Sequence, residues 1–560
     1  MARRESLMSQ LGQRLAEVAG WHTVTRDDAK VVGELYATRT IDDIKSLNEA
    51  AFFDELFCYI REIGVWPLFE QLDPQDRRRA LYPFMQFVLF TVMRCVGGVQ
   101  SLLATHDVLL TDESLMGLLG FNAIQVKQGS NARGQDRRTE PVEVRGAFSY
   151  ETVADNIVKI GPEALAKMFN GVIRRLAAQA IFPKKVDVSL DATDDEATPT
   201  YTTDDGREVP HVTRHKRPDV RANRHARKVA ATVYGWKIWL VWEPTSQVPL
   251  AMIVGDINEA DNTYALAVLL QARANIQGYA ELRSVALDRG FLDGKLLSAI
   301  EAEGIIVYIP AKNNLDITKD AREIARRAEK AAQQGRTLPG AVYKERTRTV
   351  TRGSGKNAVE QEQTTSLVSV SDLPCDWWNP QGSEHIPKEP KKLRATVVLR
   401  WDGAPKDAEK EVVILTTHTS DDPFVAFDAY DDRSLIENSC NREAKETWFL
   451  EHHPKRSEAG LRVHAYFVFV CMALMAGFRA YKSKIDEAHR KGQDTGMSRY
   501  RRQLEASNSD KVLIVIGSSF AILRTFELAL LGGLSVQKQQ AAGESAHTVL
   551  RRYGVPVPDD

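Results

Sequence analysis

The chain has 560 residues, an apolar fraction of 43% and a formal net charge of −1, which is typical of a folded globular protein and excludes an indiscriminately basic surface. Its length predicts about three or four domains. Five scattered cysteines without a Cys-x-x-Cys pair favour reduced thiols over a zinc site or a disulfide framework. We see no signal peptide at the start, and the most apolar window, residues 465–478, is shorter than the roughly 20 residues of a membrane span. We therefore expect a cytoplasmic protein with no membrane partner.

Residues 1–180 are expected to form an all-α N-terminal region. Apolar residues recur at helical spacing through residues 52–57 and 82–89. A polar stretch with Gly and Arg, residues 129–141, predicts a loop between helices.

After residue 180 strand-like runs appear between helical stretches, and this pattern predicts the first part of an α/β core over residues 181–311. Strands and helices are expected in the order β-β-β-α-β-α-β, at residues 185–190, 229–242, 248–254, 259–274, 283–288, 292–303 and 305–309. Strands that alternate with helices of this length predict a mixed sheet covered by helices.

Residues 312–425 predict a β-rich insertion into this core. A charged, Ala-rich helix over residues 319–334 is closed by Gly335, and four strands follow at residues 341–350, 364–370, 393–401 and 411–417. Helical sequence returns near Asp431. We expect residues 426–480 to complete the core and residues 481–560 to form an α-helical C-terminal region.

Three acidic residues stand at informative places in this pattern. Asp191 ends the alternating run 186–191, Asp288 ends the run 285–288, and Glu437 lies on a predicted helix. In an RNase H-like topology the first and fourth strands are neighbours, so Asp191 and Asp288 would meet at adjacent strand ends. Carboxylate oxygens are the ligands that Mg²⁺ prefers near a phosphate.

With these acids the sequence resembles bacterial insertion-sequence transposases of the DDE type, in particular the group with a β-strand insertion and a Tyr-Arg-Glu-Lys signature. The resemblance covers roughly residues 185–480. The matching text is Asp191-Ala192-Thr193, Tyr234-Gly235-Trp236-Lys237, Asp288-Arg289-Gly290-Phe291, Ile309-Pro310-Ala311-Lys312 and Tyr430-x-x-Arg433-x-x-x-Glu437-Asn438.

The resemblance implies a cut-and-paste DNA transposase. Asp191, Asp288 and Glu437 would be its catalytic metal ligands for two Mg²⁺ ions, with Mn²⁺ as a substitute. Tyr430 and Arg433 would hold the transposon end. The partners implied are double-stranded DNA, as terminal inverted repeats and as target, and a second copy of the chain on that DNA. The helical N-terminal region could bind DNA ends, the C-terminal region could serve dimerisation, and the enzyme would be nucleoid-associated in a bacterial cytoplasm.

One position departs from the family pattern. The family's lysine follows its glutamate by seven residues, whereas position 444 is Ala and Lys445 comes one residue later. On a regular α-helix, Lys445 would lie about 80° off the face of Glu437. Lys445 reaching round, or Arg442 in its place, are both open.

Two basic stretches are candidates for phosphate-binding tracks. Residues 207–228 hold eight Arg or Lys and two acids, a net charge of +6, and residues 319–356 hold eleven and four, a net charge of +7. Solvated loops are the alternative on charge alone. The DNA-binding candidates in the first stretch are Arg214, Lys216, Arg217, Arg221 and Arg224. The resemblance also implies that a tryptophan of the insertion stacks on a DNA base, for which Trp378 is the candidate, with Trp377 and Trp401 as alternatives.

Other readings remain beside these. Asp187 is an alternative first ligand, Glu443 is the fallback for Glu437, and Asp293 is expected to cap a helix. No Gly-x-x-x-x-Gly-Lys loop occurs, so ATP is not expected. The competing functions are a structure-specific nuclease of the same fold without strand transfer and a catalytically silent DNA-binding protein.

Overall fold

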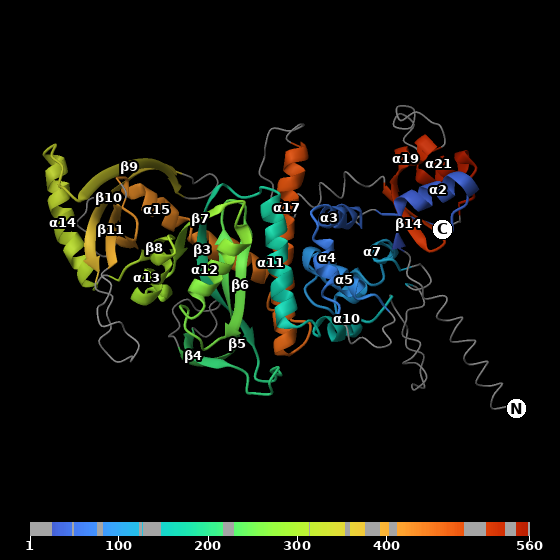
Figure 1. The fold of residues 1–560 in the computed structure, drawn as a ribbon, viewed down its shortest axis with the longest axis horizontal. Coiled ribbons are helices and arrows are strands. Elements are labelled where there is room, and N and C mark those ends of the chain that lie inside the picture. The colour runs from blue at the N-terminus through green and yellow to red at the C-terminus, as the bar shows by residue number, and fades with distance from the viewer. Residues whose placement is uncertain are drawn as a thin grey trace. The chain divides into compact units, whose positions relative to one another are not determined.

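The structure is a computed structural model that describes residues 25–47, 50–74, 82–121, 126, 147–216, 229–312, 314–352, 359–375, 393–402, 411–419, 421–486, 511–531 and 545–557. The chain divides into two compact units. Unit 1 comprises residues 1–168 and 448–560, and unit 2 comprises residues 169–447. The expected α/β class is confirmed (Figure 1).

Unit 2 is built on a ten-stranded mixed sheet. Its strands are β3 (Lys185–Ala197), β4 (His211–Lys216), β5 (Val229–Glu243), β6 (Val248–Asp256), β7 (Glu281–Leu287), β8 (Ile306–Pro310), β9 (Ala341–Arg352), β10 (Val359–Cys375), β11 (Leu393–Asp402) and β12 (Val412–Thr416). They run in the order β4-β5-β3-β7-β8-β12-β11-β10-β9, and β6 pairs with β5. The pairs β3–β7 and β7–β8 are parallel, and the other pairs are antiparallel.

The core part of this sheet has all the predicted elements in the predicted order, but one further strand, β4, which was not predicted, lies between the first two. Helix α12 (Ala265–Ile276) leads from β6 into β7, and α13 (Gly294–Ala302) lies in the connection between the parallel strands β7 and β8. Asp293 accepts a hydrogen bond from the Leu296 amide at 2.9 Å, so the expected helix cap is confirmed. Every second residue at the start of β3 is buried, namely Val186, Val188 and Leu190. This alternation determines on which face of the sheet each residue between them lies.

The β-rich insertion continues the core sheet. Strand β12 pairs with β8 through the partners Ile414 and Pro310. Helix α14 (Asp316–Gln333) packs against β9, β10 and β11, and α15 (Pro423–Asp431) lies beside the same strands in Figure 1. A hydrophobic cluster that includes Leu367, Val398 and Phe427 joins these strands to α15. The sheet edge of β8 is therefore covered by the insertion.

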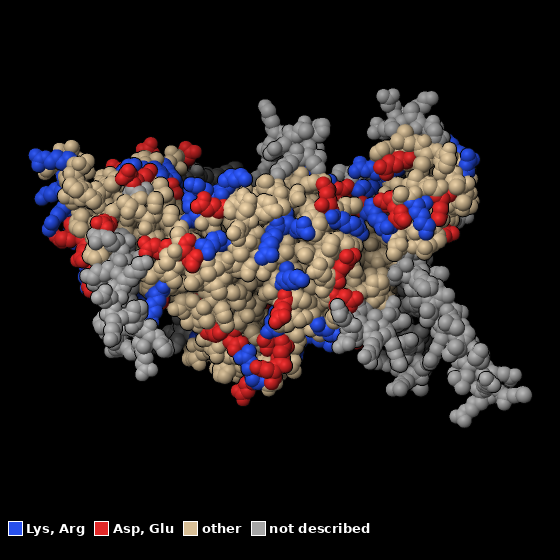
Figure 2. Space-filling view, in the orientation of Figure 1, with Lys and Arg blue, Asp and Glu red and all other residues tan. Residues whose placement is uncertain are grey.

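Helix α14 carries much of the basic stretch 319–356, and Figure 2 shows Lys and Arg gathered along it. Three of these cations pair with acids of the same helix. Lys319 contacts Asp316 at 2.7 Å, while Arg326 and Arg327 contact Glu323 at 3.4 and 3.9 Å. Ion pairs within an exposed helix therefore account for these three cations without a bound phosphate.

Unit 1 is mainly helical. Its helices are α2 (Asp28–Thr38), α3 (Ala50–Glu62), α4 (Trp66–Glu70), α5 (Phe84–Val96), α6 (Thr105–Val108), α7 (Glu113–Leu118), α10 (Tyr150–Ile157), α17 (Glu458–Asp486), α19 (Thr525–Leu531) and α21 (Ala546–Tyr553), and α11 (Pro162–Ala178) crosses its boundary at residue 168. Aromatic rings of α3 and α17 pack together. The ring centroids of Phe52 and Tyr59 lie 6.1 and 5.4 Å from the ring centroid of Phe478. Helix α17 contains one segment, Glu458–Lys482, long and apolar enough to cross a membrane, but 94% of its apolar window is buried inside the protein. That burial is typical of a core helix.

A small sheet corrects the expectation of purely helical terminal regions. Strands β1 (Thr25–Arg26), β2 (Asp43–Ser46), β13 (Lys511–Ile516) and β14 (Ser519–Arg524) pair in the order β1-β14-β13-β2. The run Val512-Leu513-Ile514-Val515 before Gly517 is a strand and turn signal that helical periodicity obscured. Its partner Ile44 lies more than 450 residues away, so local sequence could not reveal the pairing.

Candidate active site

The parallel pairing of β3 with β7 brings Asp191 and Asp288 side by side: Asp288 follows the end of β7, whereas Asp191 lies within β3, which continues to Ala197 instead of ending at Asp191 as expected. Leu190 of β3 is the register partner of Leu287 of β7, and each aspartate is the next residue in its chain. After Asp288 the backbone turns into the short 3₁₀ helix η1 (Arg289–Phe291). Adjacent strands in a sheet lie about 5 Å apart, so the backbones of the two aspartates are neighbours in the sheet.

Glu437 approaches from the segment that follows α15. It lies in a π-helix, η4 (Ile436–Asn441), which is followed by α16 (Arg442–Glu446). Arg433 donates a hydrogen bond from Nη2 to Oε1 of Glu437 at 2.7 Å, and its Nη1 lies 3.8 Å from Oδ1 of Asp288. One guanidinium group, with a side chain only 11% exposed, therefore contacts two of the three predicted ligands.

Asp191, the third predicted ligand, is hydrogen-bonded to Asn441, a residue that the sequence analysis missed. Asn441, at the end of η4, donates a hydrogen bond from Nδ2 to Oδ2 of Asp191 at 2.8 Å. Asn441 is 8% exposed, and its Oδ1 is buried without a hydrogen-bond partner in the described part of the chain. The only sequence signal is an amide four residues after Glu437, one helical turn away.

Asp191 sits in a poorly solvated position. Burial raises the pKa of its carboxyl to about 6, opposed by the Ala192 amide and by the charge of Arg433. The negative charges of Glu437 and Asp288 add to the rise in the pKa. Three acids close enough to affect one another in this way favour a cation among them.

The site fits a divalent cation by its donor chemistry, while its present shape is set by Arg433. No three Asp, Glu, His or Cys side chains among the residues that the structure describes come close enough to hold a metal ion together. The guanidinium of Arg433 occupies the space between Asp288 and Glu437 and supplies the positive charge there. Carboxylate oxygens and the unpartnered Oδ1 of Asn441 are hard ligands of the type that Mg²⁺ prefers.

The π-helix explains the displaced lysine. A π turn bonds residue i to i+5 and holds about one residue more than an α turn. The extra residue in η4 rotates Lys445, rather than Ala444, toward the face of Glu437. Ala444 is fully buried, and Lys445 donates a 2.7 Å hydrogen bond to the carbonyl oxygen of Asp194 on β3. Arg442 instead pairs with Glu446 on the exposed side of α16.

The motif around Lys237 supports the turn that carries Asp288. Lys237 is buried and donates to Oδ1 of Asp261 at 2.8 Å. A Cβ added to Gly290 would lie 2.7 Å from Oδ2 of the same aspartate, so this turn packs closely on it. Gly235 has a φ of 139° and no space for a Cβ beside the Asp195 carbonyl, which explains the glycine. Asp261 is a second residue that the sequence analysis missed.

The remaining predicted residues divide into three sets. Asp187 accepts hydrogen bonds from Arg283 at 2.8 Å and from Ser284 at 2.5 Å, so it has partners of its own. Arg214 donates to Asp194 at 3.0 Å, and the Tyr430 ring centroid lies 5.9 Å from Cζ of Arg433. Outside the described residues lie Arg217, Arg221, Arg224, Trp377 and Trp378, together with the side chains of Lys216 and Trp401.

Comparison with known proteins assigns the family. A family model for the transposase DDE domain matches residues 183–475, just over half of the chain, and the chain belongs to this family. No curated protein matches the sequence. Among solved structures, the chain is similar to a piggyBac transposase synaptic complex with hairpin DNA, at 11% identity over 96% of this chain and 88% of that chain, with a TM-score of 0.36.

The chain is therefore a DNA transposase, an enzyme that cuts DNA strands and transfers them with the help of a divalent metal.

Proposed function

We propose that this transposase cleaves DNA at the ends of a bacterial insertion sequence and joins the freed 3′ ends to target DNA, with Asp191, Asp288 and Glu437 as its catalytic carboxylates. The observation that carries the proposal is the shared contact of Asp288 and Glu437 with one guanidinium, next to the point on β3 where its pairing with β7 ends and Asp191 follows. The cofactor proposed is a pair of Mg²⁺ ions, for which Mn²⁺ would substitute. When bound, such ions activate an attacking hydroxyl and stabilise the leaving oxygen of an in-line phosphodiester displacement.

Arg433 has two roles in this proposal. Without DNA its charge offsets the repulsion between Asp288 and Glu437. With DNA bound, its planar fork of donors would bind a phosphate of the transposon end, which frees both carboxylates for the cations. Tyr430 on the same segment would donate its hydroxyl to a phosphate.

Asn441 is a positioning residue for Asp191 in this scheme. Its amide N–H binds one carboxylate oxygen and so holds the carboxylate of Asp191 in one orientation. Outer partners of this type orient a metal ligand and are often as sensitive to substitution as the ligand itself.

Lys445 is the proposed counterpart of the signature lysine. It lies on the side of α16 that faces β3, while Arg442 is engaged with Glu446 on an exposed surface. A lysine that projects from this side would neutralise a DNA phosphate as a compact point charge.

The basic stretch from Arg214 to Lys228 is proposed as part of the DNA path, and Trp378 as the base-stacking residue of the insertion. Removing charge from this stretch should weaken DNA binding and flatten its salt dependence. We also propose a homodimer on paired transposon ends, in a nucleoid-associated cytoplasmic location, with the five-region division of the sequence analysis as its domain plan.

The test is incubation of the protein with the terminal repeats that flank its gene and with Mn²⁺. Cleavage with joining to a target plasmid supports the proposal. Cleavage without joining indicates a nuclease, and binding without cleavage indicates a silent DNA-binding protein; either result would overturn it.

A further inference from the structure

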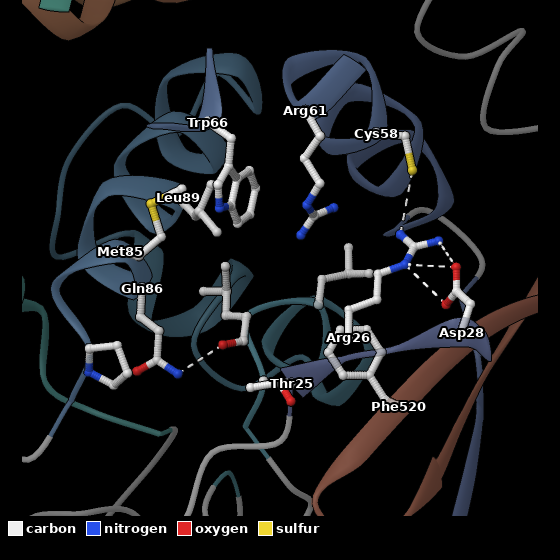
Figure 3. A pocket seen from close by; sticks show the side chains of 14 residues that line it. Thr25, Arg26, Asp28, Cys58, Arg61, Trp66, Met85, Gln86, Leu89 and Phe520 are labelled. Carbon is white, nitrogen blue, oxygen red and sulfur yellow. Dashed lines mark hydrogen bonds and ion pairs between the residues drawn. The ribbon is translucent and has the colours of Figure 1, made fainter. Parts of the chain in front are cut away.

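A pocket in unit 1 has the composition of a ligand-binding site that is separate from the carboxylates. Its volume is about 610 Å³, within the range of roughly 300–1,000 Å³ that is usual for small-molecule sites. Figure 3 shows Trp66, Met85 and Leu89 on one side and Arg26 and Arg61 on the other. The pocket therefore has a largely apolar lining that includes two arginine side chains.

Among the described residues, acidic side chains pair with only one of these cations. Arg26 forms ion pairs with Asp54 and, at 3.1 Å, with Asp28. Asp54 is 2% exposed and also binds Lys511 at 3.1 Å, so this carboxylate already serves two cations. The charge of Arg26 is therefore satisfied within the protein.

Arg61 has no hydrogen bond or ion pair to any residue that the structure describes. Its guanidinium stacks over the Trp66 ring, 3.8 Å from the ring centroid. Burial and the neighbouring charge of Arg26 lower its pKa, the reverse of what a paired arginine shows. A partly desolvated cation with open donors favours an anion in this pocket.

Gln86 adds a second unsatisfied group to the lining. It is 4% exposed and donates from Nε2 to the Leu119 carbonyl at 2.8 Å. Its Oε1 has no partner among the described residues. A buried acceptor of this type costs about 1–3 kcal/mol, which a ligand N–H would recover.

We propose that this pocket binds one unpaired nucleotide, with its phosphate on Arg61, its base against Trp66 and the apolar wall, and a base N–H on Gln86. The phosphate would accept hydrogen bonds from the guanidinium of Arg61. The base would place its apolar faces against the apolar lining and donate a hydrogen bond from its edge to Gln86. Because the chain is a DNA transposase, the expected source is an unpaired nucleotide within DNA, and a free nucleotide is the alternative source. The inference is independent of the catalytic assignment to Asp191, Asp288 and Glu437.

The test uses the full-length protein with the fluorescent base 2-aminopurine, whose emission falls on stacking. Three probes are compared: a duplex with one extrahelical 2-aminopurine, the same duplex fully paired, and the free 2-aminopurine deoxynucleoside monophosphate. We expect quenching and about tenfold tighter binding of the extrahelical probe than of the paired duplex. Equal quenching and affinity with the free monophosphate would assign the pocket to free nucleotides.

Arg61→Gln and Gln86→Leu should each remove most of the tenfold preference. Arg39→Gln is the matched control, because Arg39 also packs over an aromatic ring of unit 1, at 4.9 Å from the Tyr553 centroid, and does not line the pocket. Circular dichroism checks that each variant is folded. The proposal is wrong if the wild type binds the extrahelical and paired probes alike, or if Arg61→Gln behaves as Arg39→Gln does. Asp288→Ala should keep the preference, so failure at either site is distinguishable.

Discussion

Asn441 donates a 2.8 Å hydrogen bond from its side-chain amide to Asp191 and thereby links the π-helix that carries Glu437 to strand β3. Two segments nearly 250 residues apart in sequence are held together at the site by this contact. The position of Asp191 relative to Glu437 therefore depends on the π-helix as well as on the sheet.

Replacement of Asn441 by Ala should lower DNA cleavage by about 10- to 100-fold, the usual cost of losing an outer partner of a metal ligand. The concentration of Mn²⁺ needed for half-maximal cleavage should rise in parallel, because Asp191 is no longer held in one orientation. A Mn²⁺ titration of cleavage measures both effects, with Ser434→Ala on the same segment as the control. Unchanged Mn²⁺ dependence in Asn441→Ala would show that the hydrogen bond has no positioning role.

Replacement of Arg433 by Met should tighten binding of Ca²⁺ in the absence of DNA by about fivefold, since a competing ion pair worth roughly 1 kcal/mol is removed. The same variant should lose cleavage and bind transposon-end DNA more weakly. Isothermal titration calorimetry gives the Ca²⁺ affinity directly. Arg442→Met is the matched control, because Arg442 pairs only with the exposed acid Glu446 among the contacts seen here. Weaker Ca²⁺ binding by Arg433→Met would contradict the competition.

The raised pKa of Asp191 predicts a pH dependence of stability when no divalent cation is present. Its pKa rises from the ordinary 3.8 to about 6 on folding, so the folded state binds more protons between these values. Stability should therefore fall as the pH rises from about 4 to 6, and the free energy of unfolding of Asp191→Asn should exceed that of the wild type by about 3 kcal/mol at pH 7.5.

Thermal unfolding in EDTA at pH 5.0 and 7.5 measures this effect. The stabilisation by Asp191→Asn should be larger at pH 7.5, whereas Asp187→Asn, which loses its partner Arg283, should be destabilised at both. A Tm difference between Asp191→Asn and wild type that does not change with pH would rule out the burial of a charged Asp191.

The rotation imposed by the π-helix predicts which basic residue of α16 serves catalysis. Lys445→Ala should reduce cleavage of transposon-end DNA by about tenfold or more, because a charge that faces β3 is lost. Arg442→Ala removes an equal charge from the same helix and should change cleavage less than twofold, as expected for an exposed pair. Gel-based cleavage rates compare the two variants. The reverse order of effects would restore Arg442 as the signature residue.

Much of the core of unit 2 could be predicted from the sequence because its elements are locally encoded. The alternation of Val186, Val188 and Leu190 and the helix cap at Asp293 are signals within a few residues. The parallel register of β3 and β7 then follows from the topology and brings Asp191 next to Asp288.

The parts that could not be predicted depend on contacts across the chain. Nothing near Asn441 in the sequence identifies Asp191 as its partner, and nothing near Gly290 identifies Asp261. The π-helix is equally hidden, because its extra residue shows only as an irregular spacing before Lys445. The small sheet of unit 1 was missed because β2 and β13 come from opposite ends of the chain.

The most direct measurement is Mn²⁺-dependent cleavage and joining of transposon-end DNA by single-residue variants, with DNA affinity measured alongside. Asp191→Ala, Asp288→Ala and Glu437→Ala should each abolish cleavage while they still bind the DNA. Asp187→Ala and Glu443→Ala, which remove acids from the same strand and the same helical segment, should retain it. Full cleavage by any of the first three variants, or loss of cleavage only in the last two, would contradict the assignment of these carboxylates.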